Sequence, residues 1–373
     1  MRTDRTFLHS SEGKGLKRTL LAGTLLLSMF AGAVCVADNK PPVGKELTRT
    51  QQLLSVKHAE GLGLVTVAAI RKAYDGKSVQ VLFNERAQIF TLDATRVSSR
   101  ELLAGLEEAL KKTRPLVVTF DDSRATIKAV ARPSAKELEL FRSLRQKMLQ
   151  SEKPQIVDLE KIDTTHFNDI KNLKFPVWKL CLKTVPNYTK AKEIFDYCAK
   201  QSCNLPGPYL VTPCIPFQYV RDGCYARAHK MKWLISQHFG YCSEKVFSFA
   251  NSNNDDLAVV ASKWGGCCVT WWYHVAPVIQ VKTKILIKGK VLNLVLAYVI
   301  DPGMFDKPVL LSTWLRAQEN TTCSPHAKVS AYTIQPSSAY SPANYQGTTF
   351  TTDPQYISTN ATLINYQNLT TCN

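Results

Sequence analysis

The cysteines of this chain are confined almost entirely to its C-terminal half. Ten of the 11 lie between Cys181 and Cys372, and the other, Cys35, lies near the N-terminus. In an oxidising compartment this asymmetry is typical of a disulfide-stapled domain that follows a cysteine-free region. All ten of these cysteines could form disulfides. If one of them is a free nucleophile, nine remain, so one more must also be unpaired.

The N-terminus predicts export to such a compartment. Basic residues Lys14, Lys17 and Arg18 precede an apolar run over 19–27, and small residues lead to Ala37. This pattern is typical of a secretory signal peptide over residues 1–37, and it predicts a secreted protein, extracellular or periplasmic. An uncleaved anchor is the alternative, because the apolar run could just span a bilayer. A lipid anchor on Cys35 is disfavoured by the neighbouring Val34.

The exported chain divides by composition. Residues 38–150 lack cysteine and predict a small α+β domain. Its expected elements are strands over 78–83 and 87–92 joined by a turn, a helix over 98–112, strands over 116–120 and 125–130, and a charged helix from 134. Residues 151–174 are predicted to be a linker open to proteolysis. Residues 175–373 are predicted to be the disulfide-stapled domain, with an ordered tail tied down by the terminal cysteine.

The positive charge does not indicate a nucleic-acid partner. Lysine and arginine number 47 against 30 acidic residues, for a formal charge of +17. No block of five consecutive basic residues occurs, and no nucleic-acid-binding motif is present. A basic surface that keeps the protein soluble explains the composition.

The cysteine spacing also argues against a metal centre. Cys203 and Cys214 are 11 residues apart, Cys267 and Cys268 are adjacent, and the chain has no CxxC or HxxxH pair. Adjacent cysteines rarely ligate one metal ion without strain. We therefore expect neither a metal nor a cofactor.

Cys224 has a setting that distinguishes it from the other cysteines. Asp222 and Gly223 predict a turn, residues 225–235 favour a helix, and Gly240 ends it. Cys224 then lies in the first helical turn, where unpaired N–H groups and the helix dipole favour a thiolate and can bind an oxyanion. A disulfide is the default alternative for any cysteine of this half.

A nucleophilic cysteine needs a base and a group that orients the base. His229 lies about 140° round the same helix and cannot face the thiol, so it is expected to be a surface or structural residue. His274, on a predicted strand over 267–276, is the better candidate, and Asp301 ends a strand over 296–300. Each residue has an ordinary alternative role: His274 could be a buried core histidine, and Asp301 could cap a turn. Together they match the order of a papain-like or transglutaminase-like thiol site.

The segments over 214–219 and 222–231, CIPFQY and DGCYARAHKM, closely resemble the nucleophile segment of the bacterial protein-glutaminases, which are secreted enzymes that deamidate glutamine side chains in proteins. The runs around His274 and Asp301 resemble the family's histidine and aspartate strands. The resemblance implies an α+β, transglutaminase-like or papain-like hydrolase domain with an antiparallel sheet and an N-terminal nucleophile helix. It implies catalytic Cys224, His274 and Asp301.

The same resemblance extends to the substrate site and the first domain. Trp271, Trp272 and Tyr225 are predicted to bind substrate, although core packing is expected for at least one of the two tryptophans. The region 38–150 is similar in layout to the family's inhibitory pro-domain. The expected partners are proteins or peptides with exposed glutamine and the chain's own pro-domain, with no nucleic acid, no membrane after signal removal, and a monomeric state. The chain departs from the family at the polar residues 251–256 and at Cys181 and Cys198, which look additional.

Three other functions fit parts of the same pattern. A transglutaminase shares the acylation step and transfers the acyl group to an amine. A secreted papain-like cysteine protease would also have a pro-domain. A disulfide-rich binding module would have Cys224 in a bridge, so a count of free thiols separates it from the enzymes.

Overall fold

The computed structural model describes residues 62–148, 155–158, 183–209, 211–250, 255–287, 290–347 and 349–372. Every described residue belongs to one compact unit, which falls within Asn39–Asn373. The predicted signal peptide over 1–37 lies outside the described residues. No helix within these ranges is both long and apolar enough to cross a membrane.

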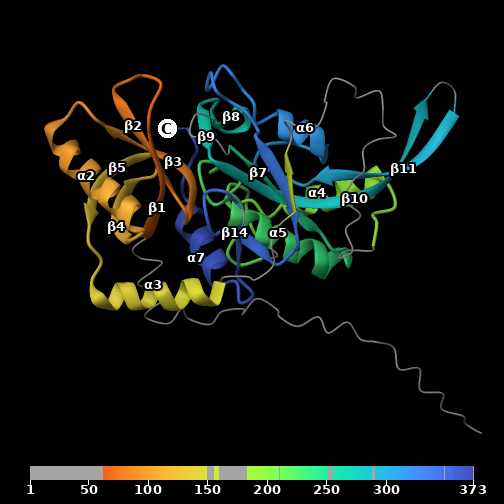
Figure 1. Ribbon diagram of the computed structural model, residues 1–373. Coiled ribbons are helices and arrows are strands. Elements are labelled where there is room, and N and C mark those ends of the chain that lie inside the picture. Colours follow the sequence, from red (N-terminus) through yellow and green to blue (C-terminus); the bar gives the residue numbers. More distant parts are fainter. Residues whose placement is uncertain are drawn as a thin grey trace, which may run out of the picture. The chain divides into compact units, whose positions relative to one another are not determined.

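The first part of the described chain is a small barrel with a helix against it (Figure 1). Its strands are β1 (Leu62–Lys72), β2 (Ser78–Phe83), β3 (Arg86–Asp93), β4 (Pro115–Asp121) and β5 (Thr126–Ala131). The pairings β1–β2, β2–β3, β3–β5, β5–β4 and β4–β1 close the barrel. Helix α2 (Val97–Lys112) buries Leu106 and Ala109 in the barrel core. Helix α3 (Ala135–Met148) follows.

These elements confirm the sequence analysis except at one strand. The hairpin β2–β3, helix α2, strands β4 and β5 and the start of α3 all fall where the sequence predicts them. Strand β1 was not predicted. Its run over 62–72 mixes small and apolar residues without strict alternation, and pairing on both sides, with β2 and β4, gives it a strand conformation.

The second part is built on a six-stranded sheet in the order β12-β11-β10-β7-β13-β6. The strands are β6 (Gln155–Asp158), β7 (Glu244–Phe249), β10 (Tyr273–Ile287), β11 (Lys290–Val299), β12 (Val309–Leu310) and β13 (Ala331–Gln335), and all neighbours are antiparallel. Strand β6 comes from the predicted linker over 151–174. Part of that segment is therefore an edge strand rather than a free connection.

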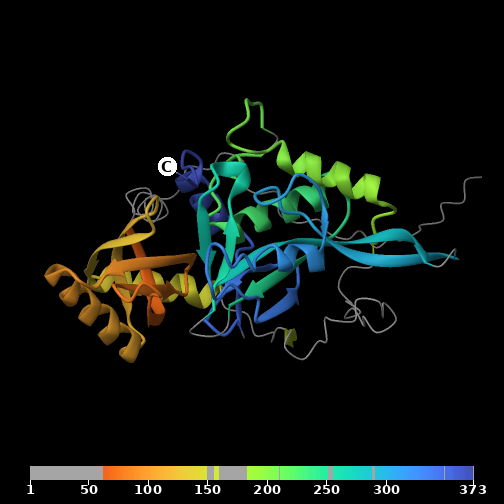
Figure 2. The same ribbon diagram turned by 90° about the horizontal axis from the view of Figure 1, so that it is seen from above.

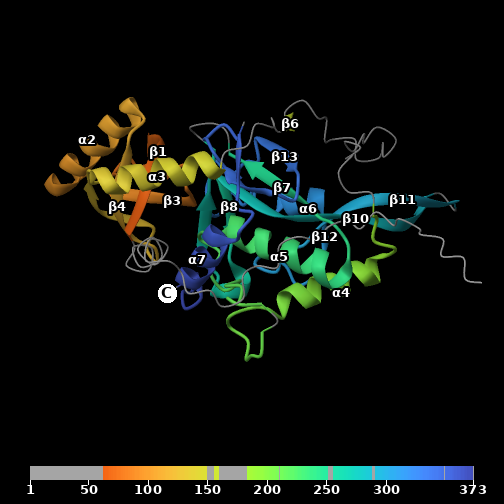
Figure 3. The same cartoon turned by 90° about the horizontal axis from the view of Figure 1, so that it is seen from below.

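Helices cover both faces of this sheet (Figure 3). Helices α4 (Tyr188–Ala199) and α5 (Cys224–Phe239) pack on one face, and the short α6 (Leu311–Arg316) packs on the other. Alternate residues of β10 serve the two cores: Tyr273 and Val275 lie with residues of α4 and α5, whereas Ala276 and Val278 lie with residues of α6. Helix α7 (Ile357–Tyr366) packs on α5.

Two further strands extend the sheet of the barrel into the cysteine-bearing part. Strands β8 (Leu257–Val260) and β9 (Cys268–Trp271) pair with each other, and β9 also pairs with β3 of the barrel. These three strands can be followed in Figure 1 and, from above, in Figure 2. The predicted strand over 267–276 is thus two strands, because the chain leaves β9 at Trp271 and enters β10 at Tyr273. A 3-10 turn (Ser262–Trp264) and the pair β14 (Ala339–Pro342) and β15 (Phe350–Thr352) complete the elements.

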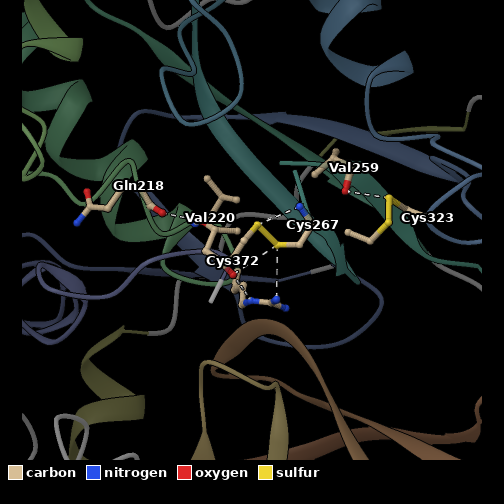
Figure 4. The surroundings of a disulfide bond; sticks show 9 residues. Gln218, Val220, Val259, Cys267, Cys323 and Cys372 are labelled. Atoms are coloured by element: carbon tan, nitrogen blue, oxygen red, sulfur yellow. Dashed lines mark hydrogen bonds between the residues drawn. A yellow bond between two sulfur atoms is a disulfide. The ribbon is translucent and has the colours of Figure 1, made fainter. Parts of the chain in front are cut away.

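Disulfides connect the cysteine-bearing part as the sequence predicts (Figure 4). Bridges join Cys203 to Cys214, Cys267 to Cys372 and Cys268 to Cys323, and Cys242 is also disulfide-bonded. The Cys267–Cys372 bridge confirms that the tail is tied down. Among the described cysteines, Cys198 and Cys224 are free.

Candidate active site

The N-terminus of α5 places Cys224 in a buried cluster of hydrophobic residues. Gly223, the N-cap residue, has φ 77°, a left-handed conformation that glycine adopts without strain. A Cβ at this position would lie 2.9 Å from Cδ2 of Tyr366, so a larger residue would collide with α7. Glycine therefore lets the chain turn tightly into the helix, and Cys224 follows as its first residue.

His274 and Asp301 form a buried pair at the ends of neighbouring strands. Nε2 of His274 lies 2.8 Å from Oδ2 of Asp301. Burial alone would raise the pKa of Asp301, but the His274 imidazole and the hydrogen bonds from His274 and Trp314 outweigh it and hold that pKa below its ordinary value. Asp301 is therefore a carboxylate that fixes one ring nitrogen of His274.

Two indoles enclose the His274 ring. Trp271 stacks on it with 4.7 Å between ring centroids, and Trp314 stacks at 5.3 Å. The Trp314 indole N–H also donates to Asp301 Oδ2 at 2.9 Å. Nδ1 of His274 is buried and makes no hydrogen bond with any other described residue. The imidazole is thus held in one orientation, with Nδ1 left for proton transfer.

The backbone of β10 connects Cys224 to this pair. The N–H of Val275, the residue after His274, hydrogen-bonds to the Cys224 sulfur. Burial raises the pKa of the Cys224 thiol to about 12, although the nearby Arg227 and the Val275 N–H both favour the thiolate. The position at a helix start had led us to expect a stabilised thiolate. In the intact chain burial outweighs that effect, because the thiol is 1% exposed.

The structure assigns different surroundings to the three predicted substrate-binding residues. The Trp271 indole donates to the carbonyls of Val220 and Arg221 and packs on His274, which is the core-packing role expected of one tryptophan. The Trp272 indole donates to the carbonyl of Arg86, in the barrel. Tyr225 is buried and hydrogen-bonds with Thr362.

His229 lies apart from this chemistry, as its helical position predicted. His229 is buried rather than on the surface, so of the two expected roles, surface residue and structural residue, the second is correct. Its Nε2 contacts the carbonyl of Asp353 at 3.1 Å, and its Nδ1 contacts Nζ of Lys245 at 2.6 Å.

The tip of the β2–β3 hairpin covers the site. Arg86 makes an ion pair with Asp222, with Nε 3.0 Å from Oδ2, and donates to the Tyr366 hydroxyl at 2.8 Å. The N–H of Ala87 donates to Asp222 Oδ1 at 3.1 Å, and Gln88 is paired with Trp271 across strands β3 and β9. Ala87 belongs to the same buried cluster as Cys224. The first domain therefore contributes to the burial of the thiol.

A second contact holds the barrel further along the chain. Arg71 donates to the carbonyl of Asp255 at 2.8 Å and makes an ion pair with Asp256. Tyr74 stacks on His326 with 4.1 Å between centroids. The barrel is thus anchored at two places.

Among the described residues, no group of three or more His, Cys, Asp or Glu side chains is placed so that it could hold a metal ion. The candidate site offers instead a free thiol, an oriented imidazole and a carboxylate.

Similar proteins are found by sequence and by structure. A family model described as glutaminase matches residues 191–318. Two crystal structures of pro-protein-glutaminase, one of them a mutant, match with TM-scores of 0.57 and 0.58 and identities of 25% and 26%; each match covers 84% of this chain and 94% of that one. An NMR structure of protein-glutaminase from Chryseobacterium proteolyticum is 31% identical, covering 51% of this chain and 91% of that one, with a TM-score of 0.42.

The chain belongs to the protein-glutaminase family. It is an enzyme of the glutamine-deamidating type, with a mixed α and β fold like that of the pro-protein-glutaminase structures. No curated protein matches the sequence. The matched range includes Cys224, His274 and Asp301.

Sequence reasoning missed three residues of the candidate site. Arg227 is one turn after Cys224 on α5, so its place beside the thiol follows from helical spacing. Asp222 was assigned only to a turn, although its carboxylate binds the barrel. Trp314 comes from α6, and no motif in the sequence indicates that it packs on His274.

Proposed function

We propose that this chain is the precursor of a secreted protein-glutaminase that converts glutamine side chains of proteins and peptides to glutamate with release of ammonia. The observation that carries the proposal is a free cysteine at the start of α5, contacted by the N–H of Val275, next to the buried His274–Asp301 pair. A free thiol also argues against a binding module in which Cys224 is bridged.

The proposed reaction uses a thioester intermediate. His274 Nδ1 takes the proton of the Cys224 thiol, and the thiolate attacks the δ-carbonyl carbon of glutamine. N–H groups of the first turn of α5, which have no partner within the helix, stabilise the oxyanion. The imidazolium protonates the nitrogen of the tetrahedral intermediate, the C–N bond breaks, and ammonia departs, leaving a γ-glutamyl thioester.

The second half of the reaction returns the enzyme to its starting state. His274 removes a proton from water, which attacks the thioester carbonyl and releases glutamate, and the thiolate is reprotonated. Asp301 keeps the imidazole in one orientation and stabilises its protonated form. Trp271 and Trp314 hold the ring between them. The proposal involves no metal or cofactor.

The first domain, residues 38–150, is proposed to inhibit the enzyme until the chain is cut within 151–174. The hairpin residues Arg86 and Ala87 occupy the approach to Cys224, and burial raises the pKa of that thiol to about 12. Removing the hairpin exposes the site and lowers this desolvation cost. Export is proposed from the predicted signal peptide, and the mature enzyme is proposed to act as a monomer.

The test compares the full chain with the chain cut within 151–174, each incubated with a glutamine-containing protein. We expect ammonia release from the cut chain only, with no fragments and no incorporation of a fluorescent amine. Peptide fragments would indicate a protease, and amine incorporation a transglutaminase. Full activity of the uncut chain would disprove inhibition by the first domain.

A further inference from the structure

The carboxylate of Asp222 accepts hydrogen bonds from two consecutive residues of the barrel and from two groups of the cysteine-bearing part. Oδ1 accepts the N–H of Ala87 at 3.1 Å and that of Gly223 at 2.7 Å. Oδ2 lies 3.0 Å from Nε of Arg86 and accepts the Tyr366 hydroxyl at 2.9 Å. Asp222 is 0% exposed, two residues before Cys224. One carboxylate thus binds both the backbone of one residue and the cationic side chain of the residue before it.

The dipeptide lies in an extended strand that crosses the site. The Trp272 indole donates to the carbonyl of Arg86 at 3.0 Å, and Gln88 is paired with Trp271 of β9. Because alternate residues of a strand face opposite sides, Arg86 and Gln88 share one face and Ala87 takes the other. Ala87 is buried in the same cluster as Cys224, and its N–H binds the residue two positions before that cysteine, so we take its position as that of a reacting side chain.

We infer that Asp222 is a specificity subsite for an arginine immediately before the reactive glutamine. The inference rests on the proposed function and defines its substrate class. A polypeptide bound in the register of β3 would place its glutamine at the position of Ala87 and the preceding residue at the position of Arg86. When the barrel leaves, the Asp222 carboxylate loses the one cation that contacts it among the described residues, since Arg227 contacts only the Asp222 backbone carbonyl, and a substrate arginine replaces Arg86.

Arginine fits this subsite better than lysine. Arg86 uses Nε for Asp222 and Nη2 for the Tyr366 hydroxyl, two donors at fixed spacing that an ammonium group does not provide. Asp222 and Tyr366 belong to the cysteine-bearing part and remain after cleavage.

Other contacts of Arg86 leave with the barrel. Its guanidinium lies over the rings of Phe90 and Phe120 and pairs with Asp122, all of them barrel residues. A substrate arginine therefore gains the Asp222 and Tyr366 contacts alone. The expected preference is about tenfold, as for one charge-assisted interaction.

The test uses the full chain, folded intact and then cut within 151–174, and the peptides acetyl-Ala-X-Gln-Ala-amide with X as Arg, citrulline or Leu. Citrulline matches arginine in shape and lacks its charge. We expect kcat/KM for ammonia release to be about tenfold higher with Arg than with citrulline or Leu. In Asp222→Asn the ratio of Arg to citrulline should fall to within about twofold, whatever the overall rate. Equal rates in the unsubstituted protein would overturn the subsite and leave the glutaminase proposal standing.

A binding measurement decides the subsite independently of turnover. Calorimetry of the same cut chain with acetyl-Ala-Arg-Ala-Ala-amide, which reproduces Arg86 and Ala87, should give a Kd about tenfold lower than its citrulline counterpart. Tyr366→Phe should reduce that difference. Equal Kd values would refute the subsite, whereas tight arginine-dependent binding without ammonia release from any peptide would support it and count against the glutaminase proposal.

Discussion

At the scale of single residues, the two free cysteines have opposite settings. Cys224 starts a helix near Arg227 and Asp301, and it receives a hydrogen bond from the backbone N–H of Val275. Cys198 is buried in α4, where burial raises its pKa with no other contribution. A reactive cysteine must be able to form a thiolate and to meet its substrate. The same substitution at Cys224 and at Cys198 should therefore affect activity differently.

We predict that Cys224→Ser abolishes ammonia release by the cut chain, because a serine hydroxyl is a far weaker nucleophile than a thiolate. The matched control is Cys198→Ser, which changes the same atom at a free buried cysteine and should leave kcat/KM within about threefold. Circular dichroism checks that both variants fold. Activity in Cys224→Ser would contradict the proposed mechanism.

Trp314 is predicted to position the His274–Asp301 pair without touching substrate. In Trp314→Phe the ring stacking is kept and the N–H donated to Asp301 is lost, which removes one hydrogen bond to a charged group, worth about 1.5–3 kcal/mol. We expect kcat to fall about tenfold with little change in KM, and the acidic limb of the kcat/KM pH profile to move upward. An unchanged pH profile would mean that the indole only fills space.

At the scale of elements, the β2–β3 hairpin is the part of the barrel that closes the site. Its register with β9 places Gln88 at Trp271, and its Arg86 is the cation of a buried cluster that includes Asp122 and Asp222. Removing one partner of a buried ion pair is costly, about 3–5 kcal/mol, because the remaining charges stay desolvated. The hairpin is therefore the element on which the proposed inhibition depends.

We predict that Arg86→Met loosens this inhibition in the uncut chain. Alkylation of Cys224 by iodoacetamide, followed by mass spectrometry, should become at least tenfold faster than in the unsubstituted chain. Arg96→Met is the matched control, because Arg96 is an exposed barrel arginine whose one ion pair with a described residue is to Asp93 at the surface. Equal alkylation rates in all three proteins would show that Arg86 does not hold the hairpin.

At the scale of the whole molecule, buried ionisable groups outside the site link stability to pH. His229 and Lys245 contact each other, and burial is the main cause that lowers the pKa of each well below its ordinary value. Lys232 lowers the His229 pKa further, while hydrogen bonds to the backbone at Asp353 and Ala339 oppose the shift. The folded state therefore takes up protons less readily than the unfolded chain does.

The lowered pKa of His229 makes the folded protein less stable as the pH falls. Below the ordinary histidine pKa of about 6.5 the unfolded state binds a proton that buried His229 does not, so the free energy of unfolding falls by up to about 1.4 kcal/mol per pH unit until the folded pKa is reached. We predict that Tm decreases between pH 7 and pH 5, and that His229→Gln makes this decrease smaller. Parallel Tm curves for the two proteins would rule out His229 as the source.

The sequence by itself determined the local features of this protein. The start of α5 at Cys224, the hairpin β2–β3, helix α2 and the strands that carry His274 and Asp301 follow from periodicity, turn residues and glycine positions. These signals act over a few residues, so they can be found without knowing the fold. The separation of His229 from Cys224 was predicted for the same reason, since helical geometry alone decides it.

Only the tertiary structure decided which distant residues meet. The pairing of Cys267 with Cys372 and of Cys268 with Cys323 depends on chain paths that spacing does not reveal. The contact of Trp314 with His274 and that of Asp222 with Arg86 join separate elements, and the high pKa of Cys224 reflects burial to which another domain contributes. Burial and long-range contact depend on how the elements pack together, which local sequence patterns do not specify.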